Sequence, residues 1–170
     1  VDNSVYKYSA VSQFGTQSMV NYKLIKTEFV GKDKKAGLVV LFFIPDWKYN
    51  VNRQACVILI KKIAALKNVF LIIKANTRGT GSFSEKELAE LRVHTNVTFP
   101  SIDEHSTSLI KSADIVVNFA SSIGQEAILQ RKPVCNPVYL NGNATIFDKS
   151  GVVFDAKDDE KVLSFFDTVK

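Results

Sequence analysis

The stretch ADIVVNFASSIGQEAILQRKPVCNP (residues 113–137) places three pieces of regular structure in direct succession. DIVVNF (114–119) is an apolar run of strand length, SIGQEAILQR (122–131) has the pattern of a helix, and PVCNPV (133–138) is a second strand broken by prolines. Parallel strands need a crossover between them, which is usually a helix. A strand followed by a helix and another strand therefore predicts a parallel α/β sheet.

The same alternation continues on both sides of this stretch. LVVLFFI (38–44) is an uninterrupted apolar run that ends at a Pro-Asp pair, which is typical of a strand covered on both faces of a parallel sheet. The other strands are expected at 69–74, 96–99 and 151–154. Helices are expected after Asn52, at the capping-box sequence SEKE (84–87), at 106–113 and along the stripe Val162, Phe165, Phe166 and Val169. The predicted fold class is α/β, a Rossmann-like doubly wound parallel sheet.

The first 37 residues differ from the rest because they show no clean hydrophobic period. They end in GKDKKAG (31–37), a polar segment with a glycine at each end that is typical of a loop. We expect residues 1–37 to be a linker or the remnant of a preceding region, and residues 38–170 to form one Rossmann-like domain. Because the chain begins with Val1 instead of Met, we interpret it as a piece of a longer protein.

Composition narrows the classes of partner. The net charge of +5 is compatible with phosphate-bearing ligands or an anionic membrane surface, but basic residues are not interleaved with aromatics as in nucleic-acid-binding proteins, so we expect no nucleic acid partner. No apolar stretch reaches the roughly 20 residues that span a bilayer, and no signal peptide is recognisable. Cys56 and Cys135 fall in apolar segments, which favours buried thiols in a reducing compartment. We therefore expect a cytoplasmic protein.

Histidines and acidic clusters give no metal site in this sequence. His94 and His105 stand apart, without a third ligand at metal-binding spacing, and we expect both to lie at the surface or in loops. Asp155, Asp158 and Asp159 have the pattern of a solvated helix start. We expect neither a metal nor a cofactor.

The turn ASSIGQE (120–126) carries the most chemistry among the loops at the carboxyl ends of the predicted strands, where such sheets bind ligands. A helix N-terminus offers unpaired backbone N–H groups, Gly124 allows close approach to the backbone, and Ser121 and Ser122 add hydroxyl donors. This set suits a phosphate. Glu126, one turn along the helix, is placed to accept hydrogen bonds from sugar hydroxyls.

The same residues also fit a purely structural role. Ser122 and Gln125 match the S-x-x-Q pattern of a capping box, and Glu126 in the first turn favours the helix dipole whether or not a ligand binds. The residue types alone leave both interpretations open.

The stretch 113–134 resembles the signature near the C-terminus of GT-B glycosyltransferases of the bacterial capsule and surface-polysaccharide type, with Ser, Gly, Glu, Ala, Lys and Pro in register. It is also similar to the S-G-G-x-Q-E-E-A segment of UDP-N-acetylglucosamine 2-epimerases and to the paired serines of bacterial sialyltransferases. The order of predicted elements over 38–169 is similar to the C-terminal, donor-binding half of the GT-B fold. The resemblance implies that the N-terminal, acceptor-binding half is missing from this chain.

The resemblance also implies roles for individual residues. Ser121 and Ser122 would bind the phosphates of a nucleotide-sugar donor, and Glu126 would bind the ribose. The segment FPSI would hold the edge of the base by its backbone groups; its residues are Phe99, Pro100, Ser101 and Ile102.

Two positions depart from the pattern of the family. Lys74 ends a strand that in relatives runs into a Lys-x-His-Pro motif, and the matching residues here are Ala75 and Asn76, so Lys74 or Arg78 would have to neutralise the leaving phosphate. Arg131 stands where the family has glycine before Lys-Pro, and we expect backbone strain there.

The function that the resemblance implies is transfer of a sugar from a nucleotide-activated donor to a surface glycan or lipid-linked acceptor, at the inner face of the plasma membrane. The nucleotide-sugar would be the substrate. The alternatives are half of a sugar-nucleotide epimerase, half of a CDP-glycerol-type phosphotransferase, or a nucleotide-binding module without turnover.

Overall fold

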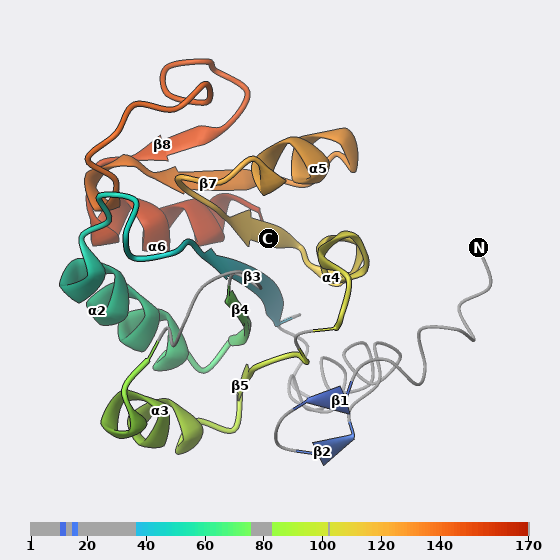
Figure 1. The fold of residues 1–170 in the computed structure, drawn as a ribbon. Coiled ribbons are helices and arrows are strands. Elements are labelled where there is room, and N and C mark those ends of the chain that lie inside the picture. Colours follow the sequence, from blue (N-terminus) through green and yellow to red (C-terminus); the bar gives the residue numbers. More distant parts are fainter. Residues whose placement is uncertain (1–10, 13–14, 17–36, 76–82, 102, 170) are drawn as a thin grey trace.

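The computed structural model describes residues 11–12, 15–16, 37–75, 83–101 and 103–169. Its main feature is a six-stranded parallel sheet with the strand order β5-β4-β3-β6-β7-β8 (Figure 1). The strands are β3 (Leu38–Ile44), β4 (Val69–Ala75), β5 (Val97–Thr98), β6 (Ile115–Val117), β7 (Val134–Pro137) and β8 (Phe154–Ala156). The helices are α2 (Arg53–Ala64), α3 (Glu85–Arg92), α4 (Ser106–Ser112), α5 (Ile123–Leu129), the 3₁₀ turn η2 (Val138–Leu140) and α6 (Asp159–Thr168). The predicted doubly wound parallel sheet is confirmed.

A short antiparallel pair, β1 (Val11–Ser12) with β2 (Gly15–Thr16), is the described part of the first 36 residues. The interpretation of residues 1–37 as a linker or remnant stays a prediction, because most of them lie outside the described residues. None of the described helices is long and apolar enough to cross a bilayer.

The order of the strands reverses beside β3. From β3 the chain adds β4 and then β5 on one side, and it returns to add β6, β7 and β8 on the other side. Both neighbours pair with β3 in parallel register, as Leu38 with Val69 and Val40 with Ile115 show. The loops that follow β3 and β6 therefore lead to opposite faces and leave a crevice between them.

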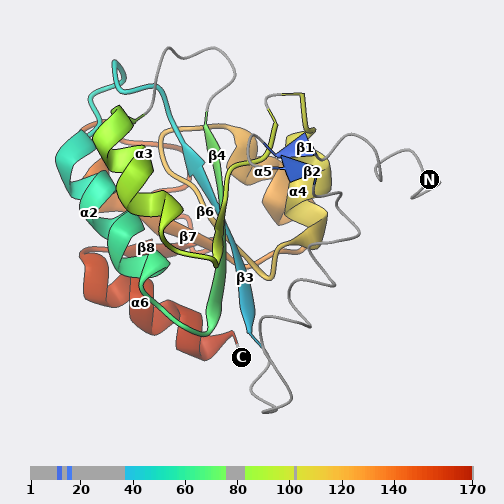
Figure 2. The same cartoon turned by 90° about the horizontal axis from the view of Figure 1, so that it is seen from below.

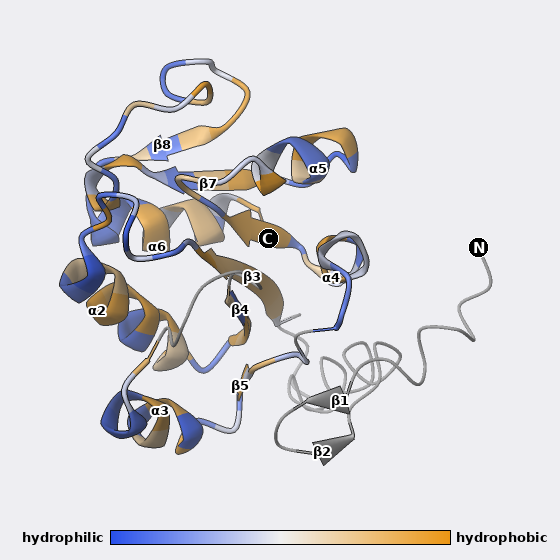
Figure 3. Ribbon diagram, viewed as in Figure 1, coloured by the Kyte–Doolittle hydropathy of each residue, from blue (hydrophilic) through white to orange (hydrophobic). Residues whose placement is uncertain are grey.

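Side chains of β3 alternate between two apolar cores, one on each face of the sheet. Val40 and Phe42 pack in the core that α2, α3 and α6 cover, whereas Leu41 and Phe43 pack in the core under α4 and α5. Figure 2 shows these two groups of helices on opposite faces of the sheet. In Figure 3 the strands of the sheet are mainly apolar, which explains why β3 reads as one continuous hydrophobic run.

Several local predictions are confirmed. The capping box of α3 forms, with the Ser84 hydroxyl accepting from the Glu87 N–H at 3.2 Å and the Glu87 carboxylate accepting from the Ser84 N–H at 2.7 Å. Asn52 caps α2, since its Oδ1 accepts from the Ala55 N–H at 3.1 Å. Cys56 and Cys135 are buried free thiols, and burial raises the pKa of Cys56 to about 12.

The last strand was predicted too early in the chain. The segment 151–154 was expected to form it, but β8 begins at Phe154, because Gly151 turns the backbone with a φ of +74° and Val152 is 62% exposed. Asp155, expected at a solvated helix start, lies in β8 and accepts from the Asn136 side chain at 2.9 Å. Asp158 does cap α6, by accepting from the Lys161 N–H at 2.8 Å.

Arg131, just after the end of α5, has a left-handed backbone, and the strain expected there from the sequence is present. Its φ is +55°, its N–H donates to the Ile128 carbonyl at 2.8 Å, and the Lys132 N–H donates to the Ala127 carbonyl at 2.9 Å. This pair of bonds is a Schellman motif, which glycine closes most easily because it lacks a Cβ.

Replacing Arg131 by glycine is therefore expected to stabilise the fold. The left-handed conformation costs an L-residue about 1–2 kcal/mol, which a glycine would not incur. Part of this stabilisation is offset because glycine has more conformational freedom in the unfolded chain. Arg131→Gly should therefore raise the free energy of unfolding by about 0.5–1 kcal/mol in urea titrations. Arg131→Ala is the control, because it removes the charge and keeps the strain. Equal stability changes in both variants would contradict the backbone explanation.

Candidate functional site

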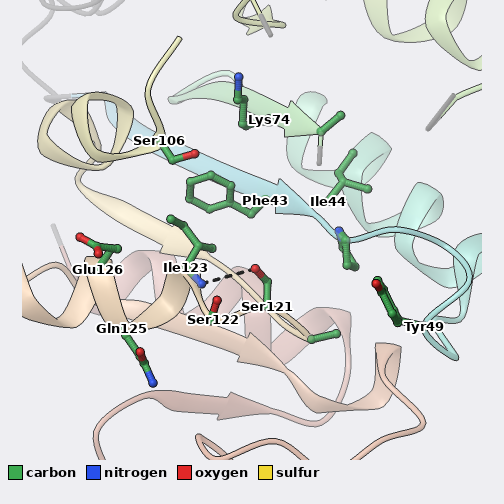
Figure 4. A pocket seen from close by; sticks show the side chains of 13 residues that line it. Phe43, Ile44, Tyr49, Lys74, Ser106, Ser121, Ser122, Ile123, Gln125 and Glu126 are labelled. Atoms are coloured by element: carbon green, nitrogen blue, oxygen red, sulfur yellow. Dashed lines mark hydrogen bonds between the residues drawn. The ribbon is translucent and has the colours of Figure 1, made fainter. Parts of the chain in front are cut away.

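A cleft of about 490 Å³ opens at the carboxyl ends of β3, β4 and β6, at the point where the strand order reverses (Figure 4). Its walls come from the ends of β3 and β4, the loop after β3, the start of α4 and the turn that leads into α5. The residues that line it are Phe43, Ile44, Pro45, Tyr49, Lys74, Ala75, Ser106, Ala120, Ser121, Ser122, Ile123, Gln125 and Glu126.

The turn at Ala120 has an unusual backbone. Ala120 has a φ of +53°, which is costly for a residue with a Cβ and is found mostly where the surroundings impose it. The buried Asn118 side chain holds the turn, since its Nδ2 donates to the Ser121 carbonyl at 2.9 Å. The turn places the predicted phosphate-binding residues Ser121 and Ser122 on the wall of the cleft.

The structural alternative for Ser122 is wrong. Ser122 is the N-cap residue of α5, but its backbone is helical, with φ −66° and ψ −12°, and its side chain makes no capping hydrogen bond. The S-x-x-Q capping box therefore does not form. Ser121 supplies a long contact instead, by accepting from the Ile123 N–H at 3.4 Å.

Gly124 has a packing reason to lack a side chain. A Cβ at this position would lie 2.8 Å from the Asn118 Nδ2 and 3.1 Å from the ring of Phe147. Gly124 is buried, and its neighbours Ile123 and Gln125 line the cleft. Its predicted role in close approach of a ligand stays a prediction.

Lys74 lines the cleft, but its ammonium is engaged elsewhere. The Nζ donates to the Ser101 carbonyl at 2.7 Å, and in Figure 4 the side chain extends away from Ser121 and Ser122. Burial lowers the pKa of Lys74, and the nearby carboxyl groups of Glu104 and Asp103 partly oppose this shift. Arg78, the other proposed phosphate ligand, lies outside the described residues.

Glu104 is a buried carboxyl group behind Lys74. It is 3% exposed, and within the described part of the chain neither of its oxygens has a hydrogen-bond partner. Burial raises the pKa of Glu104 to about 7, although the Lys74 ammonium acts in the opposite direction. An unpaired buried carboxylate is costly, so the protonated form is favoured up to neutral pH.

The predicted base-binding segment lies beside the cleft wall. Phe99 packs edge to face on Phe83, with ring centroids 5.9 Å apart, and Pro100 is buried. Ser101 uses its carbonyl to accept from Lys74 and from the Glu104 N–H. Ile102 lies outside the described residues, and the role of the segment in base binding stays a prediction.

Tyr49 and Ser106 are cleft residues that sequence reasoning missed. Tyr49 belongs to the loop after β3 and Ser106 is the first residue of α4, both at the carboxyl ends of strands, so their position was foreseeable but their side-chain direction was not. Trp47, in the same loop as Tyr49, packs against the core under α2, and the Arg53 guanidinium lies over its ring, 5.5 Å from the centroid. Over the residues that the structure describes, no group of three metal-ligating side chains comes together.

Comparisons with solved structures show the fold of this chain. Alr3699/HepE of Anabaena in complex with UDP-glucose superposes on 99% of the chain with a TM-score of 0.55 and 14% identity. A glycosyltransferase from Rickettsia africae gives a TM-score of 0.56 over 99% of the chain at 11% identity. The chain spans 45% of the length of each of these proteins.

A third match is with a single domain. The C-terminal domain of a glycosyl transferase group 1 family protein (LpcC) from Francisella tularensis is matched over 87% of its length and 99% of this chain, with a TM-score of 0.50 and 12% identity. No protein-family model and no curated protein sequence matches the chain. The sheet order and these superpositions give a Rossmann-like domain of the kind found in GT-B glycosyltransferases.

The buried carboxyl group predicts a pH dependence of stability. Between about pH 4.5 and pH 7 the folded protein retains a proton on Glu104 that the unfolded chain has lost, so raising the pH through this window lowers the free energy of unfolding. Glu104→Gln mimics the neutral acid and should be more stable than the wild type by about 1–3 kcal/mol at pH 8 and nearly equal to it at pH 4.5.

Urea titrations across this pH range check the prediction. Glu160→Gln, at an exposed position in the first turn of α6, is the control and should leave the pH dependence unchanged. A Glu104→Gln protein that is less stable than the wild type at pH 8 would mean that the carboxylate is needed as the partner of Lys74.

Proposed function

We propose that this chain is the C-terminal, donor-binding half of a GT-B glycosyltransferase, and that it binds a nucleotide-activated sugar in the cleft at the switch point. The observation that carries the proposal is the turn at 120–122. Its left-handed Ala120 is followed by the hydroxyls of Ser121 and Ser122, which lie on the wall of the cleft directly before α5. These groups are hydrogen-bond donors of the kind that bind phosphate.

The positions of the other polar groups support a nucleotide in this orientation. Glu126 lines the same cleft one turn along α5, where a carboxylate can accept from the two ribose hydroxyls. The Phe99–Ser101 backbone lies next to Lys74, on the side of the cleft where the base would extend. Likeness of fold to the C-terminal domain of LpcC supports the assignment to the C-terminal half.

Catalysis by this half would be electrostatic. Fixed hydroxyl and amide donors would stabilise the negative charge that develops on the leaving nucleotide, without a metal ion. We propose a surface glycan or a lipid-linked molecule as the acceptor, at the inner face of the membrane. Groups that activate the acceptor would belong to the other half of such an enzyme, so this chain alone is expected to bind the donor and not to transfer it.

A nucleotide-binding module without turnover is the second candidate. Lys74 donates to Ser101 instead of pointing at the serines, and Ala75 lines the cleft where the resembling enzymes carry their Lys-x-His-Pro motif. Both features reduce the positive charge available to the leaving phosphate.

The phosphate role of the serines can be tested by a double variant. Ser121→Ala with Ser122→Ala removes two donors to the phosphates and none to the nucleoside, so the affinity for nucleoside diphosphates should fall by at least about tenfold and that for the nucleoside should stay within about twofold. Isothermal titration with UDP, GDP, CDP and ADP and their nucleosides measures both. Ser164→Ala, exposed on α6, is the control. Equal losses for both ligand classes would count against the phosphate site.

The ribose role of Glu126 predicts a preference between sugars. Wild type should bind the ribonucleotide about tenfold more tightly than its 2′-deoxy counterpart, Glu126→Gln should show a smaller preference, and Glu126→Ala none. Glu85→Ala removes a carboxylate from the first turn of α3 and controls for the helix dipole. If wild type and Glu126→Ala treat the two nucleotides alike, Glu126 is only a helix residue.

A further inference from the structure

Tyr49 is an exposed aromatic residue on the wall of the cleft. The residue is 50% exposed, and it follows β3 in the loop that closes one end of the cleft. Figure 4 shows Tyr49 and Glu126 at opposite ends, with Ser121 and Ser122 between them. If the serines hold the phosphates and Glu126 holds the ribose, the remaining substituent of the diphosphate extends toward Tyr49.

The loop that carries Tyr49 is fixed by a second loop. The Gly142 N–H donates to the Asn50 carbonyl at 2.9 Å, and the Asn143 side chain donates to the Tyr49 carbonyl at 3.3 Å. The two loops meet closely, since a Cβ on Gly142 would lie 2.2 Å from the Asn50 Nδ2. Asn50 itself has a φ of +56°. The backbone of Tyr49 is thus held in place while its ring stays accessible.

The charges around the ring are balanced. The Lys48 ammonium lies over one face of the Tyr49 ring, 5.1 Å from its centroid, and is 3.0 Å from the Asp46 carboxylate. The ion pair thus takes up one face of the ring, and the other face is the one that a sugar would meet. The face of an aromatic ring carries partial negative charge and attracts the C–H bonds on the apolar face of a pyranose. A neutral sugar matches this surface better than an acidic one, because the Lys48 ammonium is already paired with Asp46 and is not available to a carboxylate on the sugar.

We propose that Tyr49 is the platform on which the sugar of the donor rests, and that it selects a neutral pyranose. This inference rests on the proposed function, since it takes its orientation from the phosphate and ribose positions. According to this proposal, the loop after β3 contributes to specificity for the sugar and not to the binding of the nucleotide.

The experiment compares each nucleotide with its sugar conjugate. Isothermal titration uses UDP, GDP, ADP and dTDP and their glucose conjugates, with UDP-glucuronate as the acidic sugar. In wild type the glucose should tighten binding about fivefold over the bare nucleotide, as expected for one aromatic contact, and glucuronate should add less. Tyr49→Ala should lose the gain from glucose and keep the affinity for the bare nucleotide, while Tyr49→Phe should keep both.

Controls separate this inference from its premise. Phe154→Ala removes an exposed aromatic residue on β8 and should change neither affinity. Thermal unfolding checks that each variant is folded. If the nucleotides bind but Tyr49→Ala keeps the gain from glucose, or wild type shows no such gain, the platform is wrong and the nucleotide site stands. If no nucleotide binds wild type, the proposed function fails and the inference about Tyr49 fails with it.

Discussion

The burial of β3 on both faces and its pairing on both edges is the constraint on which the rest of this structure depends. A strand with no exposed face needs helices on each side of the sheet, and the chain provides them by winding first toward β5 and then back toward β8. The reversal separates the loops after β3 and β6. The cleft between them is therefore a consequence of how the core is buried, and the polar residues of the site sit where the core requires loops.

Inside the cleft, neutral donors are more numerous than free charges. Lys74 is tied to Ser101, and the carboxyl group of Glu104 lies buried behind it with a raised pKa. The hydroxyls of Ser121 and Ser122 lie on the same cleft, and in the proposed function they are the groups that meet the anion. The left-handed Ala120 shows that part of the folding free energy is used to hold this turn.

The sequence predicted most of the fold because long apolar runs and local caps are visible without tertiary information. LVVLFFI could hardly be anything other than a buried strand, and the box at Ser84 and Glu87 forms as its pattern indicates. The edge strand β8 was misplaced because it is short and partly exposed, so its hydrophobicity is a weak guide. The sequence predicted the turn that leads into α5. It did not predict that the Ser122 side chain makes no capping hydrogen bond, because this depends on backbone angles that the sequence does not show.

Side-chain direction is the part of the site that remained hidden. Lys74 or Arg78 was expected to neutralise the leaving phosphate. The Lys74 ammonium donates to the carbonyl of Ser101, which is 27 residues away in the sequence, and Arg78 lies outside the described residues. Tyr49 lies in the loop after β3, and only the contact of that loop with Gly142 and Asn143 shows how it is held. Both features depend on packing between segments distant in the sequence, which periodicity and motifs do not report.

The location of the nucleotide is the central claim, and amide chemical shifts test it most directly. In a ¹H–¹⁵N titration of the whole chain with UDP, GDP, CDP and ADP, the account predicts that at least one nucleotide moves the amides of Ala120, Ser121, Ser122 and Ile123 together, with those of α6 unchanged. Shifts confined to the groove beside Leu163 and Ser164, or no shifts at millimolar nucleotide, would contradict it.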